Sequence, residues 1–470
     1  MYLNDFSDRL SPMLVKELRQ GLRTKSFIAV FLTLQILLGV ILLTAGVAAS
    51  SDHAGSTISN IIFIIFSIAV MVIQPMRGVA SLSAEIKDNT IDMIVLTRLS
   101  AWRIVIGKWS AIVSQSGLIL ITIIPYLILR YFFGGMNLLG EIIMIALIFL
   151  SSAALTAITV GLSATGSVLL RSIIPVVFLP VAAFSLFGVL LGGSPGGNLA
   201  EFCSLESPES RIAISLYVLT CAYMGFFFLS IGTSLIAPYA ENHSTLRRLL
   251  TLLITILAAI TSSTSFTHSD ALPFIFALIF APIFTISLTE FAPLVPPTYQ
   301  KFRKFGLLGK LSGPFLFPGW PSGVFFCLLI TLIAIIPFLA NGTPYRSEEQ
   351  LTVTFATLGT LLFPAVIINL FKMKGPQRIS NYILFAAGSC IVAMVLLGVS
   401  ESMSNRDFLW VFVWIPPVIF AMLASSINDT AVLFASIIVD ATLFLILIII
   451  ALRHYRKSID DITTNYPAGE

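Results

Sequence analysis

Long apolar runs, separated by short polar stretches, occupy most of the chain. About thirteen of these runs approach or exceed the roughly 18 residues that a helix needs to cross a bilayer core. The first group lies near residues 27–48, 60–76, 109–129, 142–162, 173–191 and 212–236. The second group lies near residues 249–266, 271–289, 323–340, 351–371, 382–399, 408–425 and 431–452. The pattern predicts an all-α polytopic membrane protein.

Basic residues in the short polar stretches indicate how these segments are oriented, because cytoplasmic loops are enriched in lysine and arginine. The N-terminal residues 1–26 are basic, as are the turns containing Arg247–Arg248, 301–310 and 372–378. Crossing the membrane at each run places all of these on one side, and leaves acidic or neutral loops on the other. We therefore expect the N-terminus in the cytoplasm.

The tail, residues 453–470, would lie outside with Arg453, Arg456 and Lys457 if every apolar run crossed the membrane. We favour about 12 transmembrane helices, with residues 408–425 forming a re-entrant or interfacial hairpin. Pro416 and Pro417 stand at the middle of this hairpin, where they would break a helix. With this number of crossings, the tail is cytoplasmic.

The spans form two membrane blocks of about six spans each. The first block is residues 27–236 and the second is residues 249–452, with a polar cytoplasmic linker, 237–248, between them. No convincing internal repeat relates the two blocks.

Composition agrees with a membrane protein. Of the 470 residues, 57% are hydrophobic and only 11% are charged, whereas soluble domains carry about a quarter charged residues. The net charge of +4 is spread over many loops, so no patch suited to nucleic acid is expected. The four cysteines are scattered, and no metal site is expected.

Residues 83–109 place many charges between two apolar runs. Thr90 can cap a short helix on which Ile91, Ile94 and Val95 share one face. A second helix would follow and continue into the third span. An exposed apolar face of this kind must be covered by lipid, by the protein itself or by a soluble partner. An ordinary surface helix near the lipid headgroups is the simpler interpretation.

Residues 1–26 contain a second amphipathic segment. Leu14, Leu18 and Leu22 form an apolar stripe, while Arg19 and Arg23 lie among the polar positions and can reach lipid phosphates. We expect an interfacial helix immediately before the first span.

These two segments, "SPMLVKELRQGLRTKSF" and "SLSAEIKDNTIDMIVLTRLSAWRIVIGKW", resemble the permeases of ABC transporters of the type-2 exporter class. The positions that match the family pattern are Glu85, Asn89, Thr90, Leu99, Ser100, Ile104, Val105, Gly107 and Lys108. Asn89 replaces the usual glycine, and Arg98 replaces the usual proline. The resemblance covers roughly the first half of the chain, up to residue 240.

The resemblance implies a permease subunit of an exporter in the bacterial inner membrane, assembled as a homodimer or heterodimer. A separate ATP-binding subunit would bind ATP and Mg²⁺. Residues 1–26 would form the elbow helix, and 83–109 the coupling segment that docks on that subunit. The expected docking residues are Glu85, Asn89, Thr90, Ile91, Ile94, Val95 and Arg98.

The chain itself is not expected to hydrolyse ATP. Its nearest approach to a phosphate-binding loop, "FGLLGKLSG" at 305–313, has the wrong spacing and has Leu311 where serine or threonine is needed. We predict no catalytic residues and no cofactor bound by this chain.

Polar residues inside the spans are costly and therefore suggest function. Asp440 stands near the middle of the last span, and Gln35, Gln74 and Gln115 lie in the first three. Asp440 allows an alternative, a secondary transporter driven by an ion gradient. A protonated carboxyl bonded to a hydroxyl such as that of Ser436 is a simpler explanation. A further alternative is a membrane anchor that recruits a cytoplasmic complex without moving a solute.

Overall fold

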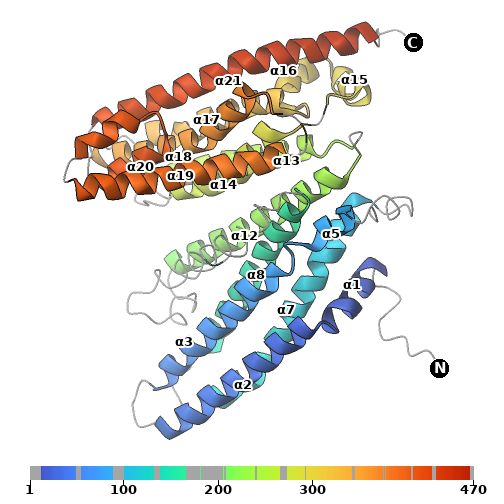
Figure 1. Cartoon of the computed structure of the whole chain (residues 1–470), viewed down its shortest axis with the longest axis vertical. Coiled ribbons are helices and arrows are strands. Elements are labelled where there is room, and N and C mark those ends of the chain that lie inside the picture. The colour runs from blue at the N-terminus through green and yellow to red at the C-terminus, as the bar shows by residue number, and fades with distance from the viewer. Residues whose placement is uncertain are drawn as a thin grey trace. The chain divides into compact units, whose positions relative to one another are not determined.

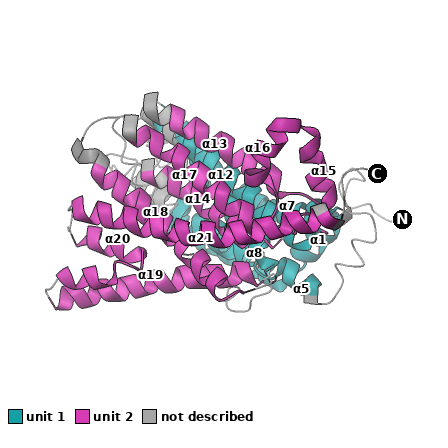
Figure 2. Cartoon of the chain, turned by 90° about the horizontal axis from the view of Figure 1, so that it is seen from above, with its two compact units in different colours: residues 1–237 teal, residues 238–470 magenta. Residues whose placement is uncertain are grey.

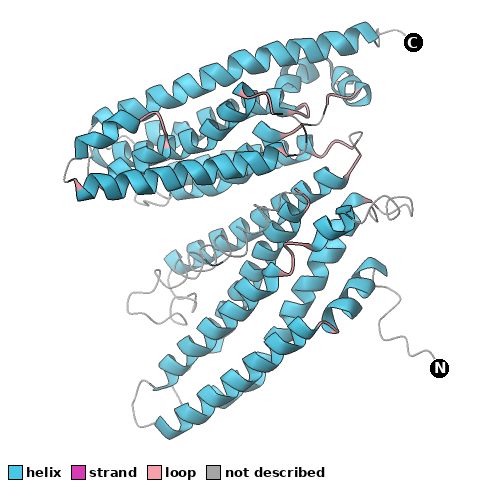
Figure 3. Ribbon diagram, in the orientation of Figure 1, coloured by secondary structure: helices cyan, strands magenta, loops and turns pink. Residues whose placement is uncertain are grey.

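The computed structural model describes most of the chain. The described residues are 12–48, 54–87, 100–131, 138–165, 208–238, 241–264, 272–291, 293–340, 344–373, 377–403, 406–425 and 430–465, with 180, 205 and 375. The chain forms two compact units, Met1–Ala237 and Pro238–Glu470 (Figure 2). All regular elements among the described residues are helices (Figure 3).

Nine helices within the described residues are long and apolar enough to cross a membrane. They are Lys25–Thr44, Ile61–Ile86, Ala101–Leu129, Leu138–Ser163, Ile214–Ile236, Trp320–Phe338, Glu348–Leu370, Arg378–Ser402 and Thr430–Ile462. Ile275–Thr289 is a shorter apolar helix. The predicted segment 173–191 lies outside the described residues, except for position 180. The molecule is a multi-span helical membrane protein.

The first unit is a group of packed helices (Figure 1), one of which is rich in small residues. Its elements are α1 (Pro12–Leu22), α2 (Lys25–Ala48), α3 (Ala54–Ser67), the π-helix η1 (Ile68–Ile73), α4 (Gln74–Met76), α5 (Ser81–Lys87), α7 (Ala101–Tyr131), α8 (Leu138–Ser163) and α12 (Pro208–Ile236). α8 packs against both α7 and α12. A Cβ on Gly161 of α8 would lie 2.1 Å from the carbonyl oxygen of Phe228, so small residues permit this close packing.

The second unit has a long final helix. Its elements are α13 (Ser244–Thr264), α14 (Leu272–Thr289), α15 (Pro296–Lys304), α16 (Gly306–Leu316), α17 (Trp320–Ala340), α18 (Pro344–Leu370), α19 (Arg378–Ser402), the 3₁₀-helix η3 (Arg406–Phe412), α20 (Pro417–Ala424) and α21 (Thr430–Asn465). The 36 residues of α21 make it about 54 Å long. A bilayer core is about 30 Å thick, so one end of α21 reaches beyond it.

Residues 408–425 form no single long helix. The 3₁₀-helix η3 ends at Phe412, and the eight-residue α20 begins at Pro417. Because Pro416 and Pro417 interrupt the backbone hydrogen bonding, neither piece is long enough to cross a bilayer. Leu409 and Met422 from the two pieces are fully buried in one apolar cluster.

Candidate functional site

The predicted coupling segment is described only at its two ends. Glu85 lies in α5, which ends at Lys87, and α7 begins at Ala101. The backbone carbonyl of Ser100 accepts hydrogen bonds from the amides of Arg103 and Ile104 and so begins α7. The other predicted docking residues lie outside the described residues: Asn89, Thr90, Ile91, Ile94, Val95 and Arg98.

A buried lysine joins the three helices around this segment. Lys108 of α7 is only 5% exposed, and its Nζ lies 3.1 Å from Oε1 of Glu17 in α1. The same Nζ lies 2.9 Å from Oε1 of Glu85 in α5. One ammonium group therefore bridges the elbow helix and the helix that leads into the coupling segment. We call Glu17, Glu85 and Lys108 the lysine bridge.

The elbow helix crosses α7 at a glycine. A Cβ on Gly107 would lie 2.9 Å from Cγ of Met13 in α1, so only a residue without a side chain allows this approach without movement of Met13. Ile104 and Val105 are fully buried in the same cluster as Met13 and Leu82. One packed contact therefore contains four of the matching positions, Ile104, Val105, Gly107 and Lys108. Gly107 permits the close approach of α1, and Lys108 forms the ion pairs.

The face that α1 buries differs from the predicted leucine stripe. Leu18 is buried, but Leu14 and Leu22 are only half-buried, and Met13 is buried in their place. Arg19 and Arg23 are exposed, and Leu14 and Arg19 each make a further interaction. The helix is thus rotated so that Met13, Glu17 and Gly21, which are spaced by four residues, face the protein.

An arginine fixes the corner between α1 and α2. Arg77 donates through Nη2 to the carbonyl of Gly21 at 3.1 Å and to Oγ1 of Thr24 at 2.9 Å. Its Nη1 donates to Oε1 of Gln115 in α7, and its guanidinium lies 5.7 Å from the ring centroid of Phe27. The elbow helix is therefore held at its middle by the lysine bridge and at its C-terminal end by Arg77.

The predicted glutamines occupy different environments. Gln115 is buried and bonds to Arg77, as above. Gln74 is buried, and its Oε1 accepts no hydrogen bond from the described residues. Gln35 is half-buried, and its backbone carbonyl, not its side chain, accepts a bond from Tyr126. They do not converge on a common partner in the described residues.

A packing test follows from the α1–α7 crossing. We expect Gly107→Ala to be less stable than Gly117→Ala by about 1–3 kcal/mol, because its new methyl group collides with Met13. Gly117 lies on the same helix, and a Cβ there would meet only the Phe149 ring, at 3.7 Å. Thermal unfolding in detergent measures both. The penalty should disappear when Met13→Ala is added, and its persistence there would contradict the proposed collision.

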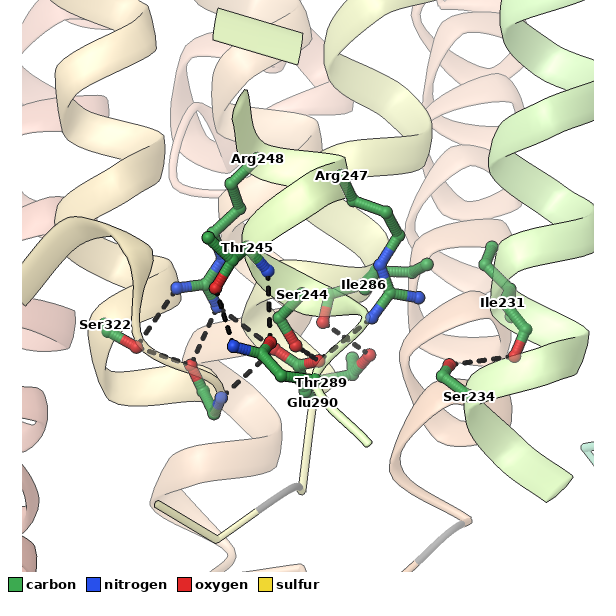
Figure 4. A network of polar contacts seen from close by, with 12 residues as sticks. Ile231, Ser234, Ser244, Thr245, Arg247, Arg248, Ile286, Thr289, Glu290 and Ser322 are labelled. Atoms are coloured by element: carbon green, nitrogen blue, oxygen red, sulfur yellow. Dashed lines mark hydrogen bonds and ion pairs between the residues drawn. The ribbon is translucent and has the colours of Figure 1, made fainter. Parts of the chain in front are cut away.

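The second unit contains a network of buried charges at the start of α13 (Figure 4). Arg247 and Arg248 are each 1% exposed, and both pair with Glu290, which follows α14. Arg247 Nη2 lies 3.0 Å from Oε1 of Glu290, and Arg248 Nη2 lies 3.1 Å from Oε2. The hydroxyl of Ser244 donates to Oε1 of Glu290. We call Arg247, Arg248 and Glu290 the arginine network.

Arg248 also binds the non-helical backbone between α16 and α17. Its guanidinium donates to the carbonyls of Phe315, Phe317 and Gly319 and to Oγ of Ser322. The amide of Gly319 donates to Oε2 of Glu290 at 3.1 Å. These groups lie where helical hydrogen bonding is interrupted and need other partners. The arginine network thus joins α13, the end of α14 and the start of α17.

The pKa of Glu290 gives a pH test. Burial raises this pKa, but Arg248, Arg247, Ser244 and the Gly319 amide together hold it below its ordinary value of 4.5. A carboxyl with a depressed folded pKa stabilises the fold fully above its ordinary pKa and loses that effect as the pH falls. We expect stability to drop as the pH falls from about 5 to about 3, and Glu290→Gln to remove part of this dependence. Thermal unfolding of both proteins across this range measures it; identical slopes would contradict the assignment.

Asp440 is buried within α21. It is 3% exposed, and neither carboxyl oxygen bonds to any described residue. Ser436 donates to the carbonyl of Leu433 instead. A Cβ on Gly359 of α18 would lie 2.4 Å from Oδ1 of Asp440 and 2.7 Å from Cβ of Pro416. The carboxyl therefore packs between α18 and the break that precedes α20.

Sequence reasoning missed part of these sites. The sequence pattern singles out neither Glu17 in the elbow helix nor Arg77. A usable signal for Glu17 is the four-residue spacing from Met13 to Glu17 to Gly21, since residues at this spacing share a helix face. Among the described residues, no three His, Cys, Asp or Glu side chains lie together as a metal site would require.

Comparison with known proteins adds no family. No family model, no curated protein and no solved structure matches this chain. Helix length and hydropathy thus carry the assignment: the chain is a multi-pass integral membrane protein.

Proposed function

We propose that this chain is the permease subunit of an ABC exporter in the bacterial inner membrane, with about 12 crossings and both termini in the cytoplasm. ATP and Mg²⁺ would be bound by a separate ATP-binding subunit, and two permease chains would assemble in the complex. The observation that carries the proposal is the lysine bridge, because it ties the elbow helix to the helix that leads into the predicted coupling segment.

The lysine bridge suits mechanical coupling. A partner that moves residues 88–99 would pull on α5 and α7, which flank them in the chain. Because Lys108 joins α7 to both Glu85 and Glu17, α5, α7 and the elbow helix would move together. The apolar face of Ile91, Ile94 and Val95 would dock in a groove of the partner, as amphipathic helices do.

The test is purification of the tagged full-length chain from its own membrane, followed by an ATPase assay. We expect an ATPase to co-purify, and to be lost when Ile91, Ile94 and Val95 are all changed to aspartate. The matched control changes Leu370 and Phe371 to aspartate, since both are exposed apolar residues at the end of α18. Absence of any ATPase in several mild detergents would overturn the proposal, and a partner without ATPase or transport activity would support the anchor.

Asp440 supports a second candidate, a transporter driven by an ion gradient. Its buried carboxyl has no hydrogen-bonding partner among the described residues and packs beside a helix break, an arrangement that ion-coupled transporters use. This candidate predicts solute movement in proteoliposomes that follows a proton or sodium gradient without ATP and is lost in Asp440→Asn. Transport that needs ATP and survives this substitution would exclude it.

A further inference from the structure

A cavity of about 470 Å³ lies between α15, α16 and the C-terminal end of α21. Its size falls in the range of small-molecule sites, roughly 300–1,000 Å³. Among the residues that the structure describes, two basic side chains line it, Arg303 from α15 and Lys310 from α16, and no acidic side chain does. Neither cation makes a hydrogen bond or ion pair with any residue that the structure describes. The cavity is therefore suited to an anion.

Aromatic residues form most of the remaining wall. Tyr299 and Tyr455 line the cavity, together with Phe302 and Phe317. The Phe317 ring centroid lies 5.0 Å from that of Phe302 and 6.0 Å from that of Tyr299. These packed rings hold α15 against the end of α16, so the positions from which Arg303 and Lys310 extend are fixed.

The turn between α15 and α16 brings these cations to one cavity. Gly306 has φ +61°, a left-handed conformation that glycine adopts without steric cost. At Gly309 a Cβ would lie 1.8 Å from the carbonyl oxygen of Phe302, so the two helices approach too closely for a side chain there. Both glycines are therefore required for the shape of the cavity.

A strongly exposed apolar strip lies on the helix that carries Lys310. Leu307, Leu308 and Leu311 are 76%, 77% and 69% exposed, and Phe305 immediately precedes α16. Such residues are unfavourable in water and are typical of helices that lie in the lipid interface. Basic residues stand close by in the chain, at Lys301 and Lys304. An occupant must offer negative charge to the cavity and hydrocarbon to the strip.

The position along α21 agrees with a membrane surface. Tyr455 and Ile459 of α21 line the cavity, and they lie beyond the apolar run 431–452 among Arg453, Arg456 and Lys457. Clusters of Lys and Arg just outside a span attract anionic lipids.

We propose that this cavity binds the phosphate-bearing headgroup of an anionic phospholipid. Arg303 and Lys310 contact the phosphate, and the acyl chains lie along Leu307, Leu308 and Leu311. The site is formed wholly within the second unit, and it does not depend on the transport function proposed above.

The experiment compares lipids on the purified full-length chain in a neutral detergent. Native mass spectrometry counts bound lipid, with phosphatidylglycerol as the probe, phosphatidylcholine as the neutral lipid and glycerol 1-phosphate as the soluble phosphate. We expect one tightly bound phosphatidylglycerol per chain, and binding roughly 30-fold weaker when Arg303 and Lys310 are both changed to glutamine. The control changes Lys301 and Lys304 to glutamine; both are exposed and neither lines the cavity.

Each outcome has a defined meaning. Retention of the lipid by the Lys301 and Lys304 control, with loss in the Arg303 and Lys310 variant, supports the site. Equal losses in both variants would show attraction by surface charge alone and overturn it. If glycerol 1-phosphate protected the chain against thermal unfolding as well as phosphatidylglycerol does, the assignment to lipid would be overturned. Leu307→Ser with Leu308→Ser should weaken phosphatidylglycerol binding about tenfold and leave binding of the soluble phosphate unchanged.

Discussion

The Arg248→Ala variant is expected to lose about 3–5 kcal/mol of folding free energy, among the largest losses for a single substitution in this protein. The guanidinium donates five hydrogen bonds inside the second unit. Its removal leaves Glu290 with one cation fewer and takes one donor from each of the backbone carbonyls of Phe315, Phe317 and Gly319. The last two still accept from the hydroxyl of Ser322. A buried acceptor left unsatisfied costs about 1–3 kcal/mol. Relaxation of the structure or entry of water would keep the total loss below the sum of the separate costs.

Two variants separate charge from geometry at Arg248. Arg248→Lys keeps the positive charge but lacks the planar fork that reaches several acceptors, so it should retain only part of the lost stability. Arg247→Ala should cost less, because Arg248 also donates to the backbone carbonyls of Phe315, Phe317 and Gly319. Thermal unfolding in detergent, followed by tryptophan fluorescence and by recovery of monodisperse protein, measures all three. A loss below about 1 kcal/mol for Arg248→Ala would contradict the role of the arginine network.

The arginine network also shows where sequence reasoning reached its limit. The sequence pattern predicts that Arg247 and Arg248 lie in a basic cytoplasmic turn, and it does not indicate that both side chains are buried. Their partner, Glu290, lies more than 40 residues away, and no local periodicity relates the two positions. In sequence, a buried pair of charges at a helix end cannot be distinguished from a solvated loop, because each is a polar stretch between two apolar runs.

Other features could be predicted because a local physical constraint sets them. The thickness of the bilayer fixes the length of an apolar run, so each of the nine described spans overlaps a predicted segment, although several extend beyond it. Proline cannot continue a helix, so the break before α20 could be placed at Pro416–Pro417. The elbow helix likewise begins at Pro12, because proline is favoured at the first position of a helix. Its rotation could not be predicted, because Met13 and Gly107 meet only in the folded chain.

Lys108→Met is the second variant with a large expected effect, a loss of about 3–5 kcal/mol. It leaves Glu17 and Glu85 close together in a partly buried site with no shared cation, and like charges held in such a site repel. Because these carboxylates belong to α1 and α5, their separation should release the elbow helix from α7. Hydrogen exchange should therefore rise in residues 12–22, while α21 in the other unit should remain protected.

The control for Lys108 neutralises its partners. Adding Glu17→Gln and Glu85→Gln to Lys108→Met removes the repulsion while keeping the side-chain volumes, and should restore much of the thermal stability. If the chain couples to an ATPase as proposed, the triple variant should still bind the partner, because Ile91, Ile94 and Val95 are intact. Its transport should nevertheless be weakened, because the connection between α1, α5 and α7 is then held by packing alone. Unchanged exchange in residues 12–22 of Lys108→Met would show that packing at Gly107 and Met13 is enough to hold the elbow helix.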